Sequence, residues 1–343
     1  MKFLKYSLIV FFSVVILAEI FLRVTGKYMV YSEMNGKPYY TDYGKVWDTW
    51  FHTRPVNDIF TPASPDFHYQ YITNQMGFRD KNYPFETNDS TFRILVTGDS
   101  YAEGVGTCYD STWPRLLEKN LRTKNIQAEV IDAGVAGSDI MYDYVFYREK
   151  LNAFNPKLIL ASFNTSDYND YIMRGGMERF FADGTTHYKR LPWYFFWYKH
   201  SRLVRALFHK IGGFNNTGLF ISQKEFDQSC TKTSIAFADV FELYYKEALK
   251  HKAQFVAVLH TIPGEIISPE KDLYATNIRG ISIIAALLKA KGVPCIDLSK
   301  PLSAEFGKKD PMVFTYAYDM HFNGTGYNFM AQAIADSLDF SVK

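Results

Sequence analysis

The chain has 343 residues, of which 47% are hydrophobic and 17% aromatic, which is enough for a sizeable core and argues against disorder. Its 38 Lys and Arg residues nearly balance 36 Asp and Glu residues, so the net charge of +2 offers no electrostatic reason for a nucleic-acid partner. The three cysteines are scattered, a pattern that fits neither a disulfide framework nor a metal site: Cys108, Cys230 and Cys295.

An apolar run spans residues 6–22, behind two lysines and interrupted only by two serines and Glu19. Its length is near the lower limit for crossing a bilayer, and no convincing small-residue cleavage site follows it. We interpret residues 1–26 as an uncleaved signal anchor, a single transmembrane helix with the rest of the chain on the periplasmic side of the cytoplasmic membrane. Glu19 lies near the end of the run, where its side chain can reach the membrane surface. A cleaved signal peptide is the alternative.

Residues 27–91 are rich in Tyr, Asp, Asn and Pro and have little periodicity. We interpret them as a stalk, an N-terminal extension that folds onto the domain after it.

From residue 92 onward, short apolar runs alternate with segments of helical periodicity. This rhythm predicts an α/β fold, a three-layer α/β/α sandwich with a central parallel sheet as in flavodoxin. The rhythm lapses at about 171–233, which we interpret as an insertion into a domain that spans 92–343. The insertion carries an aromatic cluster at 193–198, which could form the core of a lid, contact a sugar or acyl chain, or rest on the membrane.

The first candidate functional residue is Ser100, in the sequence Gly98-Asp99-Ser100 directly after a buried strand. Ligands bind beyond the carboxyl ends of the strands in open α/β sheets, so a serine placed there can meet a substrate. Taken alone, the same serine could simply cap a turn or helix.

Asp319 and His321 stand in the loop before a C-terminal amphipathic helix. A serine hydroxyl needs an imidazole to accept its proton, and the imidazole needs a carboxylate to fix its tautomer. The combination therefore predicts a catalytic triad of Ser100, His321 and Asp319. His260, at the end of another strand, is the reserve base.

These blocks resemble the SGNH (GDSL-type) hydrolase family, with Gly98-Asp99-Ser100 as the nucleophile block and the Asp319/His321 pair as the final block. Residues 132–137 resemble the family's second block, which implies that Gly137 donates a backbone N–H to the oxyanion hole. Residues 74–80, followed by a Tyr-Pro pair, are similar to the segment before the hydrolase domain of membrane-anchored bacterial members.

The third family block usually supplies an oxyanion-hole Asn, but Ser166 stands at that position here. The resemblance implies an oxyanion hole formed by the backbone of Ser100 and Gly137 together with Ser166, Asn164 or Asn169. Asp99 is expected to shape the nucleophile loop, and Asp167 to hold the third loop by accepting N–H groups.

We therefore expect a serine esterase that needs no metal or organic cofactor and acts on an O-acyl ester. By family analogy the substrate is an O-acetyl group on an extracytoplasmic glycan. The alternatives are an O-acyltransferase with the same triad and an inactive glycan-binding or assembly component, which the missing Asn would favour.

Overall fold

The computed structural model of the chain describes residues 2–27, 53–62, 64–85, 91–183, 197, 200–210 and 223–340. Its main sheet has five strands in the order β4-β3-β5-β6-β7, and every neighbouring pair is parallel. The strands are β3 (Phe92–Thr97), β4 (Ala128–Asp132), β5 (Leu158–Asn164), β6 (Gln254–His260) and β7 (Cys295–Asp297). The chain adds β4 on one side of β3 and then β5, β6 and β7 on the other side, so the order of strand addition reverses at β3.

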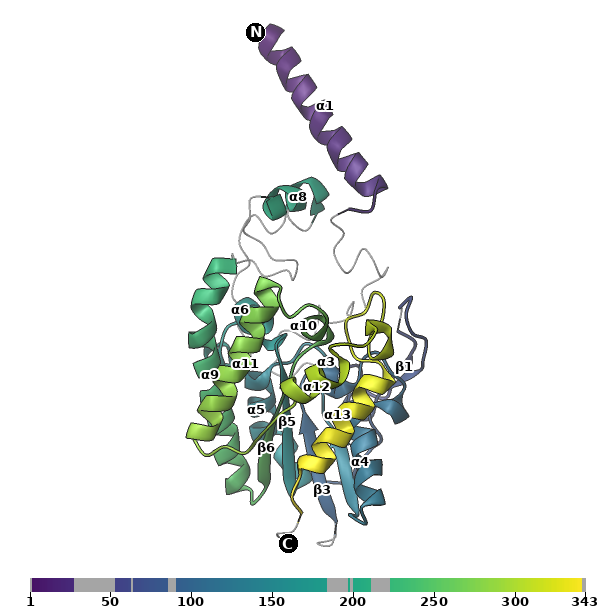
Figure 1. Ribbon diagram of the computed structural model, residues 1–343, viewed down its shortest axis with the longest axis vertical. Coiled ribbons are helices and arrows are strands. Elements are labelled where there is room, and N and C mark those ends of the chain that lie inside the picture. The colour runs from purple at the N-terminus through teal and green to yellow at the C-terminus, as the bar shows by residue number, and fades with distance from the viewer. Residues whose placement is uncertain are drawn as a thin grey trace.

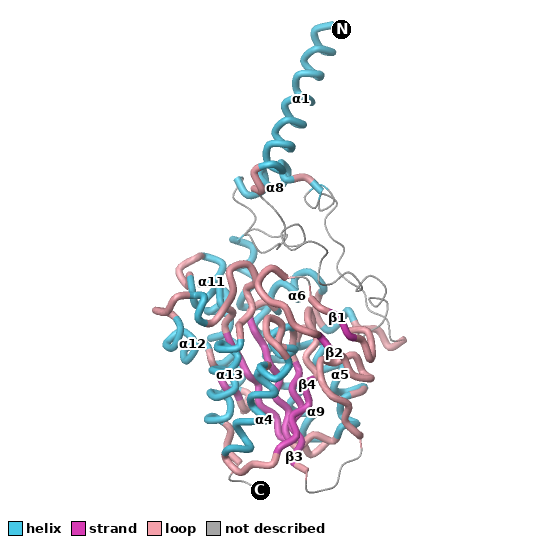
Figure 2. The backbone as a smooth tube through the Cα atoms, turned by 90° about the vertical axis from the view of Figure 1, so that its right-hand side faces the viewer, coloured by secondary structure: helices cyan, strands magenta, loops and turns pink. Residues whose placement is uncertain are grey.

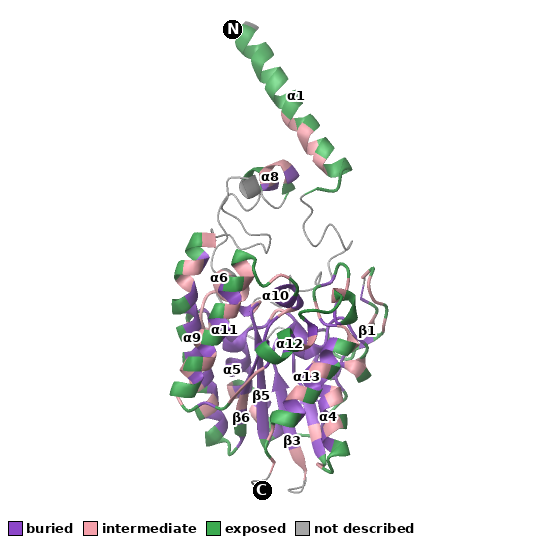
Figure 3. Ribbon diagram, viewed as in Figure 1, coloured by how far each residue is buried: buried purple, intermediate pink, exposed green. Residues whose placement is uncertain are grey.

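Alternate residues of the strands enter two separate hydrophobic cores, one on each face of the sheet. Leu95 and Ile159 pack with α5 (Ile140–Glu149), α9 (Gln223–Lys250) and α11 (Asp272–Ala290). Ile94 and Leu160 pack instead with α4 (Trp113–Thr123), α12 (Ser299–Phe306) and α13 (Gly324–Ser337). The sheet is buried between these two helical layers (Figures 1 and 3). The expected three-layer α/β/α sandwich with a parallel sheet is confirmed.

Three short helices follow the carboxyl ends of central strands: α3 (Ser100–Glu103) after β3, α6 (Asp167–Arg174) after β5 and α10 (Pro263–Ile267) after β6. They lie together at one end of the sheet, opposite the end where the chain terminates (Figure 1). The polar residues that leave neighbouring strands are therefore gathered at one edge.

The insertion differs from the sequence-based boundaries. Helix α9 already begins at Gln223, ten residues before the expected end of the insertion, and α6 extends into its beginning. A further helix, α8 (Arg202–Lys210), lies inside it. The aromatic cluster lies outside the described residues except for Trp197, whose side chain is exposed.

The N-terminal extension packs on the domain through its described part, residues 53–62 and 64–85. Strands β1 (Ile59–Phe60) and β2 (Tyr71–Ile72) pair antiparallel beside the main body (Figure 2). The buried guanidinium of Arg79 donates to the carbonyls of Gly104 and Thr107, and its plane faces the ring of Tyr69 at 4.6 Å. The extension is thus bound directly to the loop that follows Ser100.

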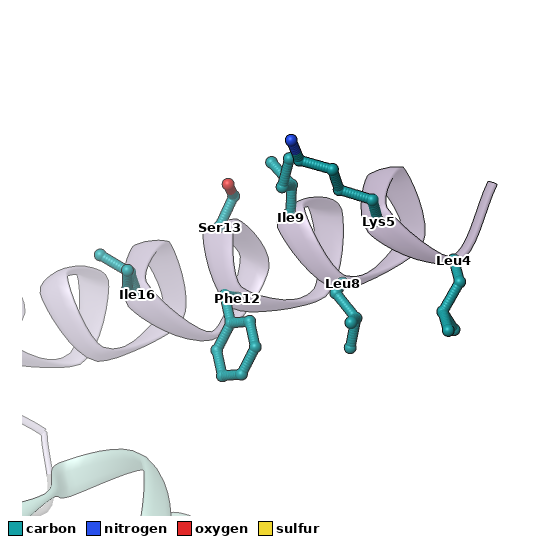
Figure 4. A pocket seen from close by; sticks show the side chains of 7 residues that line it. All are labelled: Leu4, Lys5, Leu8, Ile9, Phe12, Ser13 and Ile16. Atoms are coloured by element: carbon teal, nitrogen blue, oxygen red, sulfur yellow. The ribbon is translucent and has the colours of Figure 1, made fainter. Parts of the chain in front are cut away.

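Helix α1 (Lys2–Val24) is, among the described helices, the one long and apolar enough to be a membrane span or a signal sequence. Its apolar side chains are exposed, and a shallow hollow on its surface is formed by residues of α1 itself (Figure 4). An exposed apolar helix of this length fits a lipid environment.

Glu19 of α1 caps the N-terminus of α8. Its carboxylate accepts hydrogen bonds from the backbone N–H of Arg202 (3.1 Å) and Leu203 (2.8 Å) and from the Ser201 hydroxyl (2.9 Å). In return, the Arg202 guanidinium donates to the carbonyls of Leu22 and Arg23 at the end of α1. Each helix thus supplies the partners that the exposed end of the other lacks.

The Glu19→Ala substitution should release the N-terminus of α8. An N-terminal cap stabilises a helix by about 0.5–2 kcal/mol, so amide hydrogen exchange in residues 201–205 should become roughly 2- to 30-fold faster. The measurement is hydrogen–deuterium exchange on the full chain in detergent micelles, with Ser13→Ala on the exposed face of α1 as control. Unchanged exchange in α8 would show that Glu19 does not cap it.

Candidate active site

Ser100, His321 and Asp319 form one chain of hydrogen bonds. His321 Nε2 lies 2.8 Å from Ser100 Oγ, and His321 Nδ1 lies 2.6 Å from Asp319 Oδ1. The same Asp319 oxygen accepts the backbone N–H of His321 at 2.9 Å. The spacing of two residues lets the aspartate fix both the backbone and the ring of the histidine.

The nucleophile loop is held in a shape that requires glycine at Gly98. Its φ of +147° is unfavourable for other residues, and a Cβ there would lie 2.9 Å from the Cβ atoms of Ala102 and Ser162. Asp99 then caps α3 by accepting the N–H of Tyr101, which places Ser100 at the first position of the helix.

Asp99 also joins the nucleophile loop to the loop after β5. Its Oδ2 accepts the side-chain N–H of Asn164 (2.9 Å) and lies 2.9 Å from the Ser166 hydroxyl. That hydroxyl also lies 2.7 Å from Asn164 Oδ1, so its single proton goes to one of these two acceptors. Ser166, which we expected at the position of the family's Asn, therefore contacts both Asp99 and Asn164.

The loop after β4, which carries Gly137, is held by the buried carboxylate of Glu103. One carboxylate oxygen accepts two N–H groups of Arg54 at 3.0 Å, and the other accepts the backbone N–H of Ala136. Burial raises the pKa of Glu103, while Arg54 opposes that shift. An arginine of the N-terminal extension thus stabilises the loop in which Gly137 has a φ of +78°.

The extension also supports the loop of Asp319. The carboxylate of Asp66 accepts the backbone N–H groups of Tyr318 (3.0 Å) and Asp319 (2.7 Å). On the other side, Thr315 donates to the carbonyl of His321, and Asn323 caps α13. The loop that carries Asp319 and His321 is therefore fixed at both ends.

His260, the reserve base, does not form part of this chain of hydrogen bonds. It is fully buried, its Nδ1 lies 3.1 Å from the Thr261 carbonyl, and burial lowers its pKa. The ring of Tyr101 packs against both histidines, at 5.3 Å from His260 and 4.7 Å from His321.

Burial and neighbouring charges shift the pKa values of two groups at the site, His321 and Asp167. Burial opposes the imidazolium form of His321, but Asp319 together with the more distant Asp99 and Glu103 outweighs it, so the pKa of His321 lies above its ordinary value. Asp167 is buried at the start of α6, where burial and the carboxylates of Asp99 and Asp139 raise its pKa well above its ordinary value.

Asn169 lines a cavity next to Ser166. Among the described residues, no cluster of His, Cys, Asp and Glu side chains could hold a metal ion.

Sequence reasoning missed the residues that support the site. Arg54 and Asp66 belong to no motif and come from a region without periodicity, so no local signal marks them. Glu103 could have been noticed, because an acidic residue three positions after the nucleophile lies in an otherwise apolar and glycine-rich segment.

A hydrogen-bonded serine, histidine and aspartate at the carboxyl edge of a parallel sheet is the arrangement found in serine hydrolases. Residues 96–329, more than half of the chain, match the GDSL-like lipase/acylhydrolase family. The chain belongs to this family, which confirms the family predicted from its sequence.

Solved structures with a similar fold include the acetyl xylan esterase AlAXEase, at 17% identity over 72% of this chain and 100% of that chain, with a TM-score of 0.44. A lipase/acylhydrolase from Enterococcus faecalis is 13% identical over 71% of this chain and 93% of that chain, with a TM-score of 0.43. Axe2, an acetylxylan esterase from Geobacillus stearothermophilus, is 10% identical over 72% and 94%, with a TM-score of 0.45. No curated protein matches the sequence.

The pH profile of ester hydrolysis should report the His321–Asp319 pair. A base must be unprotonated, so kcat/KM should fall on acidification with a midpoint above 6.5, the ordinary pKa of histidine. Asp319→Asn removes the charge that raises the pKa of His321, so the midpoint should shift to lower pH and kcat should fall. Asp336→Asn, at an exposed ion pair of α13, is the control. An unchanged midpoint in Asp319→Asn would assign the acidic limb to another group.

Arg54→Ala should destabilise the protein strongly, because it leaves the carboxylate of Glu103 buried without its cation. Breaking a buried ion pair costs about 3–5 kcal/mol, whereas an exposed pair contributes about 0–1 kcal/mol. Arg148→Ala, which breaks the exposed contact with Glu149, is the matched control. Denaturant unfolding gives both values, and equal losses would contradict the role assigned to Arg54.

Proposed function

We propose that the protein is a serine esterase in which Ser100 is the nucleophile, His321 the general base and Asp319 the residue that orients His321. The observation that carries the proposal is the continuous hydrogen-bond chain from Ser100 Oγ through His321 to Asp319. Membership of an acylhydrolase family supports ester hydrolysis as the reaction.

In the first half of the reaction, Ser100 Oγ attacks the ester carbonyl and its proton passes to His321 Nε2. The tetrahedral intermediate collapses when His321 returns that proton to the leaving alcohol, which leaves an acyl-serine. In the second half, water attacks the acyl group, His321 accepts its proton, and Ser100 leaves as the free hydroxyl. Asp319 stabilises the imidazolium formed in each half.

The oxyanion of both intermediates would be held by the backbone N–H groups of Ser100 and Gly137, with a side-chain donor from the loop after β5. Ser166 is the weaker candidate for that donor, because Asp99 and Asn164 compete for its proton. Asn164 is a stronger candidate, because it has a second amide hydrogen besides the one that it donates to Asp99. Asn169, in the following helix α6, is the other candidate.

For the substrate, we propose an O-acyl ester, and specifically an O-acetyl group on an extracytoplasmic glycan. Helix α1 supports a location at a membrane. We propose the cytoplasmic membrane, with the catalytic domain on the periplasmic side. An O-acyltransferase would use the same residues, with a sugar hydroxyl replacing water as the acceptor. Transfer of label to an added glycan, measured beside free acid, distinguishes the two.

Ser100→Ala should abolish both ester hydrolysis and labelling by a fluorophosphonate probe, because only an activated serine reacts with the probe. His321→Ala should lose a similar factor, since members of a triad act as a unit, and Asp319→Ala should lose less. Activity is measured with 4-nitrophenyl acetate, and far-UV circular dichroism checks the fold.

Two outcomes would contradict this assignment. Wild-type protein that neither labels nor hydrolyses esters would favour the inactive binding component. An inactive His260→Ala variant beside an active His321→Ala variant would show that His260, and not His321, is the general base.

A further inference from the structure

Two adjacent residues of α3 bind two adjacent residues of the histidine loop, residues 314–323, which leads into α13. Ser100 Oγ lies 2.8 Å from His321 Nε2, and the hydroxyl of Tyr101 donates to the carbonyl of Met320 at 3.0 Å. Met320 directly precedes His321 in the chain. The hydrogen bond from Tyr101 therefore holds the backbone of the general base next to the hydrogen bond that the reaction uses.

The ring of Tyr101 also packs against the imidazole of His321. The two ring centroids lie 4.7 Å apart, with an angle of 42° between the planes. The hydrogen bonds of His321 to Ser100 and Asp319 both start from ring nitrogens, so they fix the direction of the imidazole better than its tilt. A hydrogen bond weakens as its angle departs from linearity, so the tilt of the ring matters as well as the distance. The Tyr101 ring is placed where it restrains this tilt.

Tyr101 is itself fixed by its neighbours. Its backbone N–H donates to Asp99 Oδ1 at 2.9 Å, and its ring centroid lies 5.8 Å from that of Phe322 and 5.3 Å from that of His260. Burial raises the pKa of Tyr101 well above its ordinary value, so the hydroxyl keeps the proton that it donates. Because protein cores are close-packed, the side chain cannot rotate without displacing these neighbours. Tyr101 is therefore a rigid support, and the buried His260 is part of its packing.

We propose that Tyr101 is a positioning residue for the reaction: its ring restrains the tilt of the His321 imidazole and its hydroxyl holds the Met320 carbonyl, which together keep Nε2 aligned on Ser100. Tyr101 acts through His321, because a residue that is 4% exposed offers little surface to a substrate. The inference rests on the proposed esterase function and adds a residue that aligns the general base of that function.

Two substitutions in the full chain, assayed in detergent micelles, test the proposal. Tyr101→Phe removes the hydroxyl and keeps the ring, whereas Tyr101→Leu removes both. The matched controls are the same two substitutions at Tyr83, which is also 4% exposed and also donates its hydroxyl to a backbone carbonyl, that of Val130 at 2.9 Å. If Tyr101→Leu does not fold, as judged by far-UV circular dichroism, Tyr101→Met takes its place, because methionine fills more of the volume without a ring.

Tyr101→Leu should lower kcat for 4-nitrophenyl acetate about 100-fold, the order of loss that a misplaced catalytic group causes, while KM changes less than about twofold. Tyr101→Phe loses one hydrogen bond and keeps the ring contact, so its kcat should fall only about 2- to 10-fold. Both Tyr83 variants should keep kcat within about twofold of wild type even where denaturant unfolding shows a loss of stability.

A spectroscopic measurement reports the alignment of His321 without any substrate. The proton between His321 Nδ1 and Asp319 Oδ1 should give a far-downfield signal in the one-dimensional proton NMR spectrum, and its loss in Asp319→Asn assigns it. We expect this signal to persist in Tyr101→Phe and in both Tyr83 variants. In Tyr101→Leu it should broaden or disappear, because the imidazole is no longer restrained.

Three kinetic results would overturn the inference while leaving the esterase function intact: an unchanged kcat in Tyr101→Leu, a loss that appears in KM instead of kcat, or an equal loss in Tyr83→Leu. A Tyr101→Phe variant as impaired as Tyr101→Leu would overturn the role of the ring. If wild-type protein hydrolyses nothing, the proposed function fails and the NMR signal alone decides. A signal lost only in Tyr101→Leu and in Asp319→Asn then supports the positioning role, and one that is unchanged in Tyr101→Leu or absent from wild-type protein overturns it.

Discussion

The hydrogen bond between Ser100 and His321 joins two loops that are 221 residues apart in the chain. A donor–acceptor distance of 2.8 Å tolerates little displacement, so both loops have to be fixed independently. The parallel sheet provides the first level of this precision, because it brings the loops after β3, β5 and β6 to one edge. Since side chains of both faces of the sheet are buried, the strands themselves have little freedom to shift.

Buried carboxylates provide the second level. Asp99 joins α3 to the loop after β5, Glu103 joins the extension to the loop after β4, and Glu265 joins the loop after β5, the loop after β6 and α11. Each of these carboxylates accepts hydrogen bonds from more than one segment, because one carboxylate can accept several donors at once. Asp66 does the same for the loop of Asp319 from outside the catalytic domain. The extension is therefore a structural part of the site, in addition to any role as a connection to α1.

The carboxyl edge of the sheet faces the end of the molecule at which α1 and α8 lie (Figures 1 and 2). Reciprocal capping by Glu19 and Arg202 explains why a carboxylate is present in an otherwise apolar helix: its charge meets the N-terminus of α8. The sequence alone indicates only that the Glu19 side chain can reach the membrane surface. Its contacts with α8, more than 180 residues away, give the side chain a specific partner inside the protein.

The sequence by itself determined the elements and the chemistry: the alternation of apolar runs and amphipathic segments, the serine after the first strand of the sheet, and Asp319 with His321 before the last helix. These signals are local, because strand and helix periodicity and the Asp-x-His spacing are set by neighbouring residues. Only the tertiary structure decided the strand order, the choice of His321 over His260 as the partner of Ser100, and the engagement of Ser166 by Asp99. It also decided the roles of Arg54, Glu103 and Glu265, whose partners are distant in sequence. A charged residue in the sequence does not reveal its partner, because that partner is chosen by the packing of the whole chain.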